Sequence, residues 1–257
     1  MKIVVLPCSF DNYGYLIICE ETGEAAVVDP GEYYPISSEI ERTGVTLKSI
    51  FCTHHHADHI GGLEDLLGEF PGLSVYGYES DKRRIPGMNH SLTDGSKIRV
   101  GNIEGQVLHT PGHTTGSICY LLEDVLFTGD TLFGAGCGRL FEGSPNQMYD
   151  ALNIKIKSLP PRTKVCFGHE YTIQNLKFAG FIEPENEAVS KRLELATVER
   201  GEGKLTTPST LKIECESNPF LRCEEKGVVG SVAEKGLGEA LDPTSVFTVL
   251  RRLKDSF

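Results

Sequence analysis

The chain has 257 residues and a formal net charge of −11 at pH 7. This length fits one large domain or one domain with a smaller companion, and the acidic balance argues against a nucleic-acid partner. Eight scattered cysteines without a C-x-x-C pair favour reduced thiols over a disulfide framework. Because no stretch approaches about 20 apolar residues, we expect no membrane span and a cytoplasmic protein.

Short β-prone runs, bounded by turn residues, dominate the first hundred residues. They predict strands at Ile3–Leu6, Tyr13–Cys19, Ala25–Val28 and Leu47–Cys52, and short β segments within residues 71–100. A helix fits Pro35–Thr43, because Ile36 and Ile40 share one face. A second helix carries its leucines on one side, at Leu63, Leu66 and Leu67.

A histidine-rich turn follows the last of these strands. It reads Thr53-His54-His55-His56-Ala57-Asp58-His59. Buried imidazoles need partners, and imidazole nitrogen together with carboxylate oxygen suits zinc, iron or manganese. In an extended turn His54 and His56 lie on one side, whereas Asp58 and His59 face a second direction. The turn therefore predicts a metal site, and the competing interpretation is a histidine-rich surface loop.

Other ligand-type side chains also follow short apolar runs. They lie in Val27–Gly31, His109–Gly116, Thr128–Thr131 and Gly168–Tyr171. Ser117–Leu122 and Val125–Thr128 predict a hairpin that leads to Asp130. Asp29 is either a supporting partner of a metal ligand or a plain turn aspartate. We interpret the basic run Lys82–Arg84 and the isolated His90 as surface residues.

The composition changes near residue 172, from β-rich with glycine turns to helical and charged. Before the change, an amphipathic helix fits Pro145–Ile156 and a strand fits Thr163–Phe167. After it, helices are predicted at Leu176–Phe181, Asn186–Glu199, Ser209–Cys215 and Ser245–Leu253. We therefore divide the chain into domains 1–172 and 173–257, the second all-helical.

The strings T-H-H-H-A-D-H, T-P-G-H-T, T-G-D-T and G-H-E-Y together resemble the metallo-β-lactamase superfamily. Within it, the chain is similar to the glyoxalase II (hydroxyacylglutathione hydrolase) family over essentially its whole length. The stretches that narrow the resemblance are Gly136–Gly143, His169–Thr172 and Arg251–Asp255. The resemblance implies an α+β fold, with an αββα sandwich as catalytic domain and a smaller α-helical domain that binds substrate.

The same resemblance implies two divalent metal ions per chain, with zinc expected and iron or manganese also compatible. Site A would consist of His54, His56 and His113, and site B of Asp58, His59 and His169, with Asp130 bridging the two. His109 would lie on the strand before His113 and outside the ligand set. Substrate contacts would come from Arg139, Phe141, Tyr171, Arg251 and Lys254. Phe141 stands where some members have tyrosine, so it offers no hydroxyl.

The implied reaction is hydrolysis of S-D-lactoylglutathione, and of other S-2-hydroxyacylglutathiones, to D-lactate and glutathione in the second step of methylglyoxal detoxification. A hydroxide that bridges two metals can attack the thioester, because coordination lowers the pKa of water to about 7. Asp58 and Asp130 would be the catalytic residues that hold it. Arg251 and Lys254, three apart on a helix, could bind the glycyl carboxylate, unless they are simply a basic helix end.

Other activities fit part of this pattern. A glutathione persulfide dioxygenase with a single iron shares the T-H-x-H-A-D-H and C-G-R strings but typically lacks a long helical C-terminal domain. A β-lactamase or lactonase does not need the basic C-terminal pair, and a diiron electron-transfer protein uses more carboxylate ligands and a flavin domain. We expect a monomer that binds a small glutathione thioester and has no nucleic-acid or membrane partner.

Overall fold

This computed structural model of the protein describes residues 1–237 and 242–257. The chain folds into two compact units, each assembled from separate segments. Unit 1 comprises Met1–His109, Thr115–Asp130 and Cys166–His169. Unit 2 comprises Thr110–Thr114, Thr131–Val165 and Glu170–Phe257.

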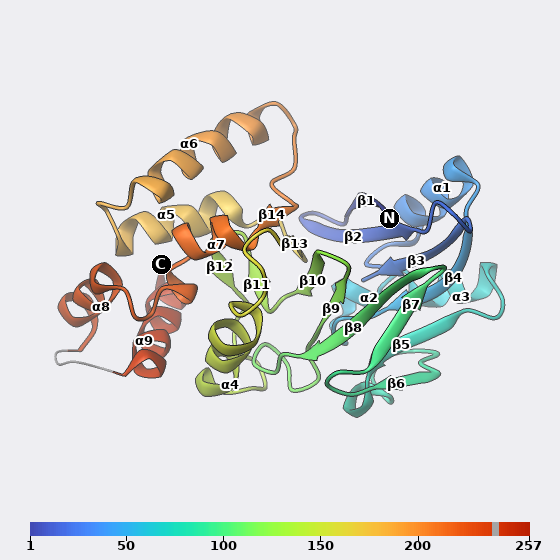
Figure 1. Cartoon of the computed structure of the whole chain (residues 1–257), viewed down its shortest axis with the longest axis horizontal. Coiled ribbons are helices and arrows are strands. Elements are labelled where there is room, and N and C mark those ends of the chain that lie inside the picture. The colour runs from blue at the N-terminus through green and yellow to red at the C-terminus, as the bar shows by residue number, and fades with distance from the viewer. Residues whose placement is uncertain (238–241) are drawn as a thin grey trace. The chain divides into compact units, whose positions relative to one another are not determined.

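Unit 1 contains two β-sheets (Figure 1). The first has the order β1-β2-β3-β4-β5-β6, with strands Lys2–Cys8, Asn12–Ile18, Glu24–Val28, Thr46–Phe51, Ser74–Tyr78 and His90–Leu92. β1 to β3 form an antiparallel meander, and β3 to β6 run parallel. Every residue of β2 is buried, which agrees with the nearly uninterrupted apolar sequence of that strand. The four strands predicted before residue 53 are confirmed.

Helices α1 (Tyr33–Thr43) and α3 (Leu63–Glu69) belong to the same unit, together with the short α2 (Ala57–Ile60). The faces predicted from their apolar spacing are the buried ones. Ile36 and Ile40 of α1, and Leu63 and Leu66 of α3, share one hydrophobic core with residues of the first sheet. Both helix predictions are therefore confirmed, and each helix is stabilised by burial of its apolar stripe.

The second sheet of unit 1 carries the strands that lead to the ligand-bearing loops. Its order is β14-β13-β10-β9-β8-β7, with β7 Lys97–Val100, β8 Ile103–His109, β9 Ile118–Leu122, β10 Val125–Gly129, β13 Lys164–Phe167 and β14 Ser209–Thr210. The predicted β9–β10 hairpin is present, and Glu123 takes a left-handed conformation (φ 51°) in its turn. Because β10 ends at Gly129 and β13 at Phe167, Asp130 and His169 follow neighbouring strand ends.

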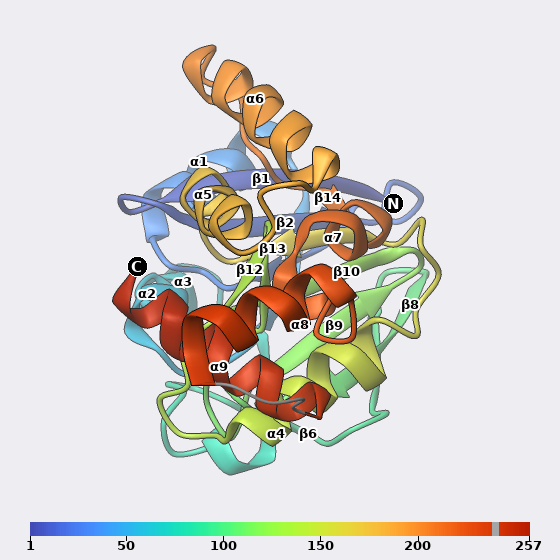
Figure 2. The ribbon, with the colours of Figure 1, turned by 90° about the vertical axis from the view of Figure 1, so that its left-hand side faces the viewer.

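Unit 2 is mainly helical. It contains β11 (Leu132–Phe133), β12 (Gly136–Cys137), α4 (Pro145–Tyr149), the π-helix η2 (Asp150–Ile156), α5 (Thr172–Ile182), α6 (Glu187–Gly201), β14 (Ser209–Thr210), α7 (Leu211–Ser217), the 3₁₀ turn η3 (Pro219–Leu221), α8 (Lys226–Val232), the π-helix η4 (Ala233–Leu237) and α9 (Pro243–Ser256). α5 and α6 lie side by side (Figure 2) and share the small buried residues Ala179, Val189 and Ala196.

Two sequence expectations for this region need correction. Ser209 and Thr210 form strand β14, paired with Val165 and its neighbour, so residues 173–257 are not all-helical. α7 begins only at Leu211, because the Thr210 hydroxyl accepts a hydrogen bond from the Ile213 amide (3.3 Å) and caps the helix. The predicted Pro145–Ile156 helix changes from α to π geometry at residue 150.

α8 was not predicted at all. Its sequence, K-G-V-V-G-S-V, combines two glycines with three valines and has a low intrinsic helix propensity. Burial of Val228 and Val232 stabilises it instead. All eight cysteines are free thiols, as predicted. No helix within residues 1–237 or 242–257 combines the length and the apolar character needed to cross a membrane.

Candidate metal centre

The residues predicted for site B and the predicted bridge Asp130 come from three separate segments of unit 1. The ligand atoms of Asp58, His59 and His169 all lie within 4.8 Å of one another. The Nε2 atoms of the two imidazoles, 110 positions apart in sequence, are separated by 3.3 Å. Asp130 Oδ1 lies 3.2 Å from Nε2 of His59 and 3.4 Å from Nε2 of His169. Asp130 and His169 come together because β10 and β13 are neighbours in the second sheet, whereas Asp58 and His59 belong to α2, which follows β4 of the first sheet.

The site A histidines of the turn also belong to this cluster. The ring centroid of His54 lies 4.6 Å from that of His56 and 4.2 Å from that of His59. His113 belongs to unit 2, where its Nδ1 lies 2.8 Å from the carbonyl oxygen of Arg139. If that nitrogen carries the proton, Nε2 of His113 is the atom available to a metal.

Behind the imidazoles of site B stand carboxylates that orient them. Asp29 Oδ2 lies 2.9 Å from Nδ1 of His59, and Asp11 Oδ1 lies 3.0 Å from Nδ1 of His169. A carboxylate at Nδ1 favours the tautomer in which Nε2 is unprotonated and can bind a metal. Asn12 donates from Nδ2 to Oδ2 of Asp58 (3.0 Å) and to its main-chain oxygen (3.2 Å).

The sequence allowed two roles for Asp29, a supporting partner of a metal ligand or a plain turn aspartate, and the geometry favours the first. Its carboxylate is 3% exposed and also accepts hydrogen bonds from the Thr53 amide and hydroxyl, both at 2.7 Å. Asp11 and Asn12 were missed. The signal was available, because Asp11 is a ligand-type side chain in a turn and Asn12 is the first residue of the fully buried strand that follows.

The electrostatics of the cluster fit a bound cation. Burial lowers the pKa of His169, but hydrogen bonds to Asp130 and Asp58 outweigh that effect and raise it to about 10. The hydrogen bond with His169 lowers the pKa of Asp58, although partial burial opposes this. The raised pKa of His169 means that this point favours positive charge, which a proton supplies in the absence of metal and a divalent cation between the two Nε2 atoms, 3.3 Å apart, would supply instead. Nitrogen and oxygen donors in this arrangement suit divalent transition metals.

Two glycines allow the backbone to approach this centre. Gly129 has φ 46°, a left-handed conformation in which a side chain would be strained, and it lies against the Thr53 side chain. A Cβ atom at Gly168 would lie 2.6 Å from Asp130 Oδ1 and 2.8 Å from Cε1 of His59. A larger residue at position 168 would therefore displace the two groups that the strand ends bring together.

The residues predicted to bind substrate lie in unit 2. Arg139, Phe141 and Arg251 line one cavity of about 420 Å³, together with Asp255. Tyr171 is not part of that lining and instead packs its ring edge-on against Phe133, with centroids 5.5 Å apart. The structure therefore brings three of the five predicted contacts into one cavity.

The sequence predicts that the charged groups of Arg251 and Lys254 project from one face of a helix, and the structure differs from this prediction. Arg251 is only 5% exposed and donates to the Cys137 carbonyl (2.9 Å) and to Asp255 Oδ1 (3.0 Å). Lys254 is half-buried, with Nζ 5.3 Å from the ring centroid of Phe178, and burial lowers its pKa to about 8. The sequence spacing did not reveal that the guanidinium of Arg251 turns inward, because its acceptor, the Cys137 carbonyl, is 114 positions away in the sequence.

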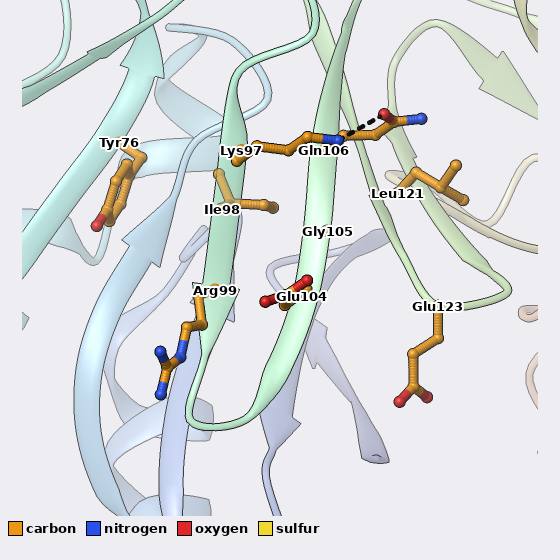
Figure 3. Close-up of a pocket in the computed structure, with 9 residues that line it drawn as sticks. All are labelled: Tyr76, Lys97, Ile98, Arg99, Glu104, Gly105, Gln106, Leu121 and Glu123. Carbon is orange, nitrogen blue, oxygen red and sulfur yellow. Dashed lines mark hydrogen bonds between the residues drawn. The ribbon is translucent and has the colours of Figure 1, made fainter.

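Other polar residues behave as predicted. His109 ends strand β8 and stacks on Tyr78, with ring centroids 4.0 Å apart, while the exposed His90 stacks on Tyr76 at 4.5 Å. A cavity of about 610 Å³ in unit 1 is lined by Tyr76 and by charges of both signs, including Arg99 and Glu104 (Figure 3). Its nine lining residues include no predicted ligand, so this cavity is separate from the histidine cluster.

Two family models match successive parts of the chain. The model of the metallo-β-lactamase superfamily matches residues 11–169, and that of the hydroxyacylglutathione hydrolase C-terminus matches residues 170–257. The hydroxyacylglutathione hydrolase of Jannaschia sp. (strain CCS1) is 43% identical over 258 residues, which cover 100% of this chain and 98% of that protein. The chain belongs to the hydroxyacylglutathione hydrolase family. The family protein of Xanthomonas euvesicatoria is 40% identical over 257 residues, covering 100% of this chain and 99% of the relative.

Solved structures agree with the metallo-β-lactamase fold. ETHE1 from Myxococcus xanthus has a TM-score of 0.67 and 27% identity, covering 100% of this chain and 99% of its own. The B3 metallo-β-lactamase BLEG-1 has a TM-score of 0.66 and 25% identity, covering 86% and 99%. TTHA1623, solved in a di-iron-bound form, has a TM-score of 0.60 and 25% identity, covering 84% and 98%. The predicted family and the metallo-β-lactamase fold are confirmed, and this fold with its histidine–aspartate cluster implies divalent metal ions.

Proposed function

We propose that the protein hydrolyses the thioester of S-D-lactoylglutathione, and of other S-2-hydroxyacylglutathiones, to a 2-hydroxy acid and glutathione. The observation that carries the proposal is the match to hydroxyacylglutathione hydrolases over 100% of the chain. The second family model supports it further, because residues 170–257 match a C-terminal region named for this enzyme. The reaction would serve as the second step of methylglyoxal detoxification.

Two divalent metal ions, with zinc expected, would be bound by the predicted ligands. Site A would use His54, His56 and His113, site B would use Asp58, His59 and His169, and Asp130 would bridge them. The assignment of His113 rests on the family resemblance, whereas the contacts within unit 1 support site B. Bound metal ions would supply the nucleophile by lowering the pKa of water to about 7, and would polarise the thioester carbonyl.

The residues of the chain contribute by holding these groups still. Asp29 and Asp11 orient the imidazoles of His59 and His169, and Asn12 fixes the Asp58 carboxylate. Such preorganisation lowers the barrier, because no ligand has to move as the carbonyl is attacked. The leaving thiolate has a conjugate acid with a pKa of about 8.5, so its departure requires no dedicated general acid from the chain.

Glutathione carries two carboxylates, and unit 2 offers the cations that would bind them. Arg139 and Arg251 line the 420 Å³ cavity together with the phenyl ring of Phe141. A guanidinium suits a carboxylate because it can donate two parallel hydrogen bonds. Tyr171 and Lys254 are the two further contacts that we propose from the resemblance. Arg251 and Lys254 belong to residues 173–257, which we propose as the substrate-binding domain, whereas Arg139, Phe141 and Tyr171 would contribute from the catalytic domain proposed for residues 1–172.

The test is hydrolysis of S-D-lactoylglutathione by purified, metal-loaded protein, followed through the loss of thioester absorbance. Rapid hydrolysis is the expected result. Hydrolysis of another ester or of a lactam, without cleavage of this thioester, would contradict the proposal. Oxygen uptake with glutathione persulfide would indicate the single-iron dioxygenase, which the match of residues 170–257 disfavours. A cytoplasmic location and a monomeric state remain predictions from the sequence.

A further inference from the structure

A buried carboxylate lies directly behind the histidine-rich turn. Asp81 closes the short 3₁₀ helix η1 (Glu79–Asp81) and is 1% exposed. Its Oδ2 lies 3.3 Å from Nδ1 of His55, and its Oδ1 lies 3.5 Å from Nη1 of Arg84. Arg84 also contacts Nε2 of His55 through Nη2. The imidazole of His55, which no ligand assignment uses, is thus engaged on both of its nitrogens.

The segment that carries Asp81 and Arg84 is firmly anchored. The amides of Arg84 and Ile85 both donate to the main-chain oxygen of Asp81, at 2.8 and 3.0 Å, and form a tight turn. Ile85 is buried in the hydrophobic core of the first sheet. On the other side, a Cβ atom at Gly116 would lie 2.5 Å from Cγ of Asp81. The Asp81 carboxylate is therefore closely enclosed, and its position is fixed independently of the histidine-rich turn.

The position of His55 in the sequence gives this contact its significance. His55 lies between the two site A histidines of the turn, and its ring is in contact with that of His56. The centroid of the His55 ring lies 5.0 Å from that of His56 and 6.4 Å from that of His54, while the rings of His54 and His56 have centroids 4.6 Å apart. A group that fixes His55 therefore also fixes the backbone on which both site A histidines are carried.

A contact that only stabilises the fold would not have to involve a residue of the histidine-rich turn. Burial of a carboxylate is costly unless it is paired, so Asp81 requires its two partners wherever it stands. Here one of the partners is the residue between two metal ligands. We propose that Asp81 and Arg84 are positioning residues for site A, which hold the turn through His55 and thereby strengthen metal binding by His54 and His56. This inference rests on the two-metal site of the proposed function.

The test compares Asp81→Asn and Arg84→Met with Glu79→Gln, a matched change at an exposed acid of the same turn. Metal-free proteins are titrated with Zn²⁺ against a chromophoric chelator, and with Co²⁺, whose visible absorption reports ligand geometry. Outer partners of metal ligands typically contribute 10- to 100-fold in affinity, and an indirect partner should lie near the lower end, at about tenfold. We expect that loss at one of two sites, with an altered Co²⁺ spectrum, in both variants and not in the control.

Arg84→Met keeps the test informative if Asp81→Asn folds poorly, because the Arg84 side chain is 40% exposed. Urea denaturation of the metal-free Arg84→Met protein should still show a cooperative transition, at a lower midpoint than wild type because the buried Asp81 carboxylate loses one partner while His55 remains beside it. Combining His55→Gln with Asp81→Asn should weaken binding no more than either change alone, because both act through one contact. Wild-type affinity and spectrum in both single variants, or additive losses in the double variant, would overturn the inference. A wild-type protein that binds two metals but leaves the thioester intact would instead refute the proposed function.

Discussion

Replacement of Asp29 by asparagine probes the support of site B, because it preserves size while changing one acceptor into a donor. Asp29 Oδ1 accepts from the Thr53 amide, and Oδ2 lies 2.9 Å from Nδ1 of His59. The backbone amide must keep an acceptor, so the oxygen of the new side-chain amide would take the Oδ1 position and its NH₂ group would face His59. Nδ1 would then have to accept, which moves the ring proton to Nε2.

A protonated Nε2 cannot bind a metal, and this nitrogen is the one that faces Asp130 at 3.2 Å. Loss of such an outer partner typically lowers metal affinity 10- to 100-fold, which corresponds to about 1.4 to 2.7 kcal/mol. In the metal-free protein, loss of a hydrogen bond to a buried charged group should cost about 1.5 to 3 kcal/mol of unfolding free energy. The loss of unfolding free energy and the loss of metal-binding free energy should therefore be similar in size.

The assay is chelator competition with Zn²⁺, together with urea denaturation of the metal-free protein. Asp11→Asn is the matched control, because it makes the same change behind His169, where Asp11 is 32% exposed. Water can replace the lost acceptor at that position, so its effect should be smaller. Two metals bound with wild-type affinity in Asp29→Asn would refute the tautomer reasoning.

Three further results are expected. Because burial lowers the pKa of Lys254 to about 8, its positive charge is present below that pH and lost above it. KM for the anionic thioester should therefore rise through pH 8, and Lys254→Met should abolish this rise; a pH-dependent rise that persists in the variant would exclude Lys254. Asp130→Asn should lower metal content and kcat together, measured by elemental analysis and turnover, whereas two retained metals would contradict the bridge. Gly116→Ala should cost about 1 to 3 kcal/mol in urea denaturation, because its Cβ meets the Asp81 carboxyl, while Gly68→Ala, with open space around it, should not destabilise.

The sequence was most informative where chemistry and periodicity coincide. The turn Thr53–His59 follows a strand with a clear apolar run, and Asp130 and His169 follow two more, so each could be predicted to lie in a loop at a strand end. Their convergence was predicted from the family resemblance, because β4 lies in one sheet and β10 and β13 lie in the other. The helix predicted at Asn186–Glu199 is present as α6, and Val189 and Ala196 on it are buried. These features depend on local patterns, which a single sequence carries.

The residues that support the ligands could not be predicted in the same way. Asp81 lies 26 positions from the histidine it contacts, and Asp11 lies 158 positions from His169. Such contacts depend on how distant segments pack, and an aspartate in a turn has the same local sequence pattern whatever it touches. The inward turn of Arg251 has the same cause, because its main-chain acceptor at Cys137 is 114 positions away.

One combined measurement tests whether the protein is a hydrolase that binds two metal ions. Metal per chain is determined by elemental analysis on the same sample that is assayed with S-D-lactoylglutathione. We expect two divalent ions per chain and rapid loss of the thioester. One iron per chain without thioester cleavage would contradict this expectation, and would require another role for the helices of residues 173–257.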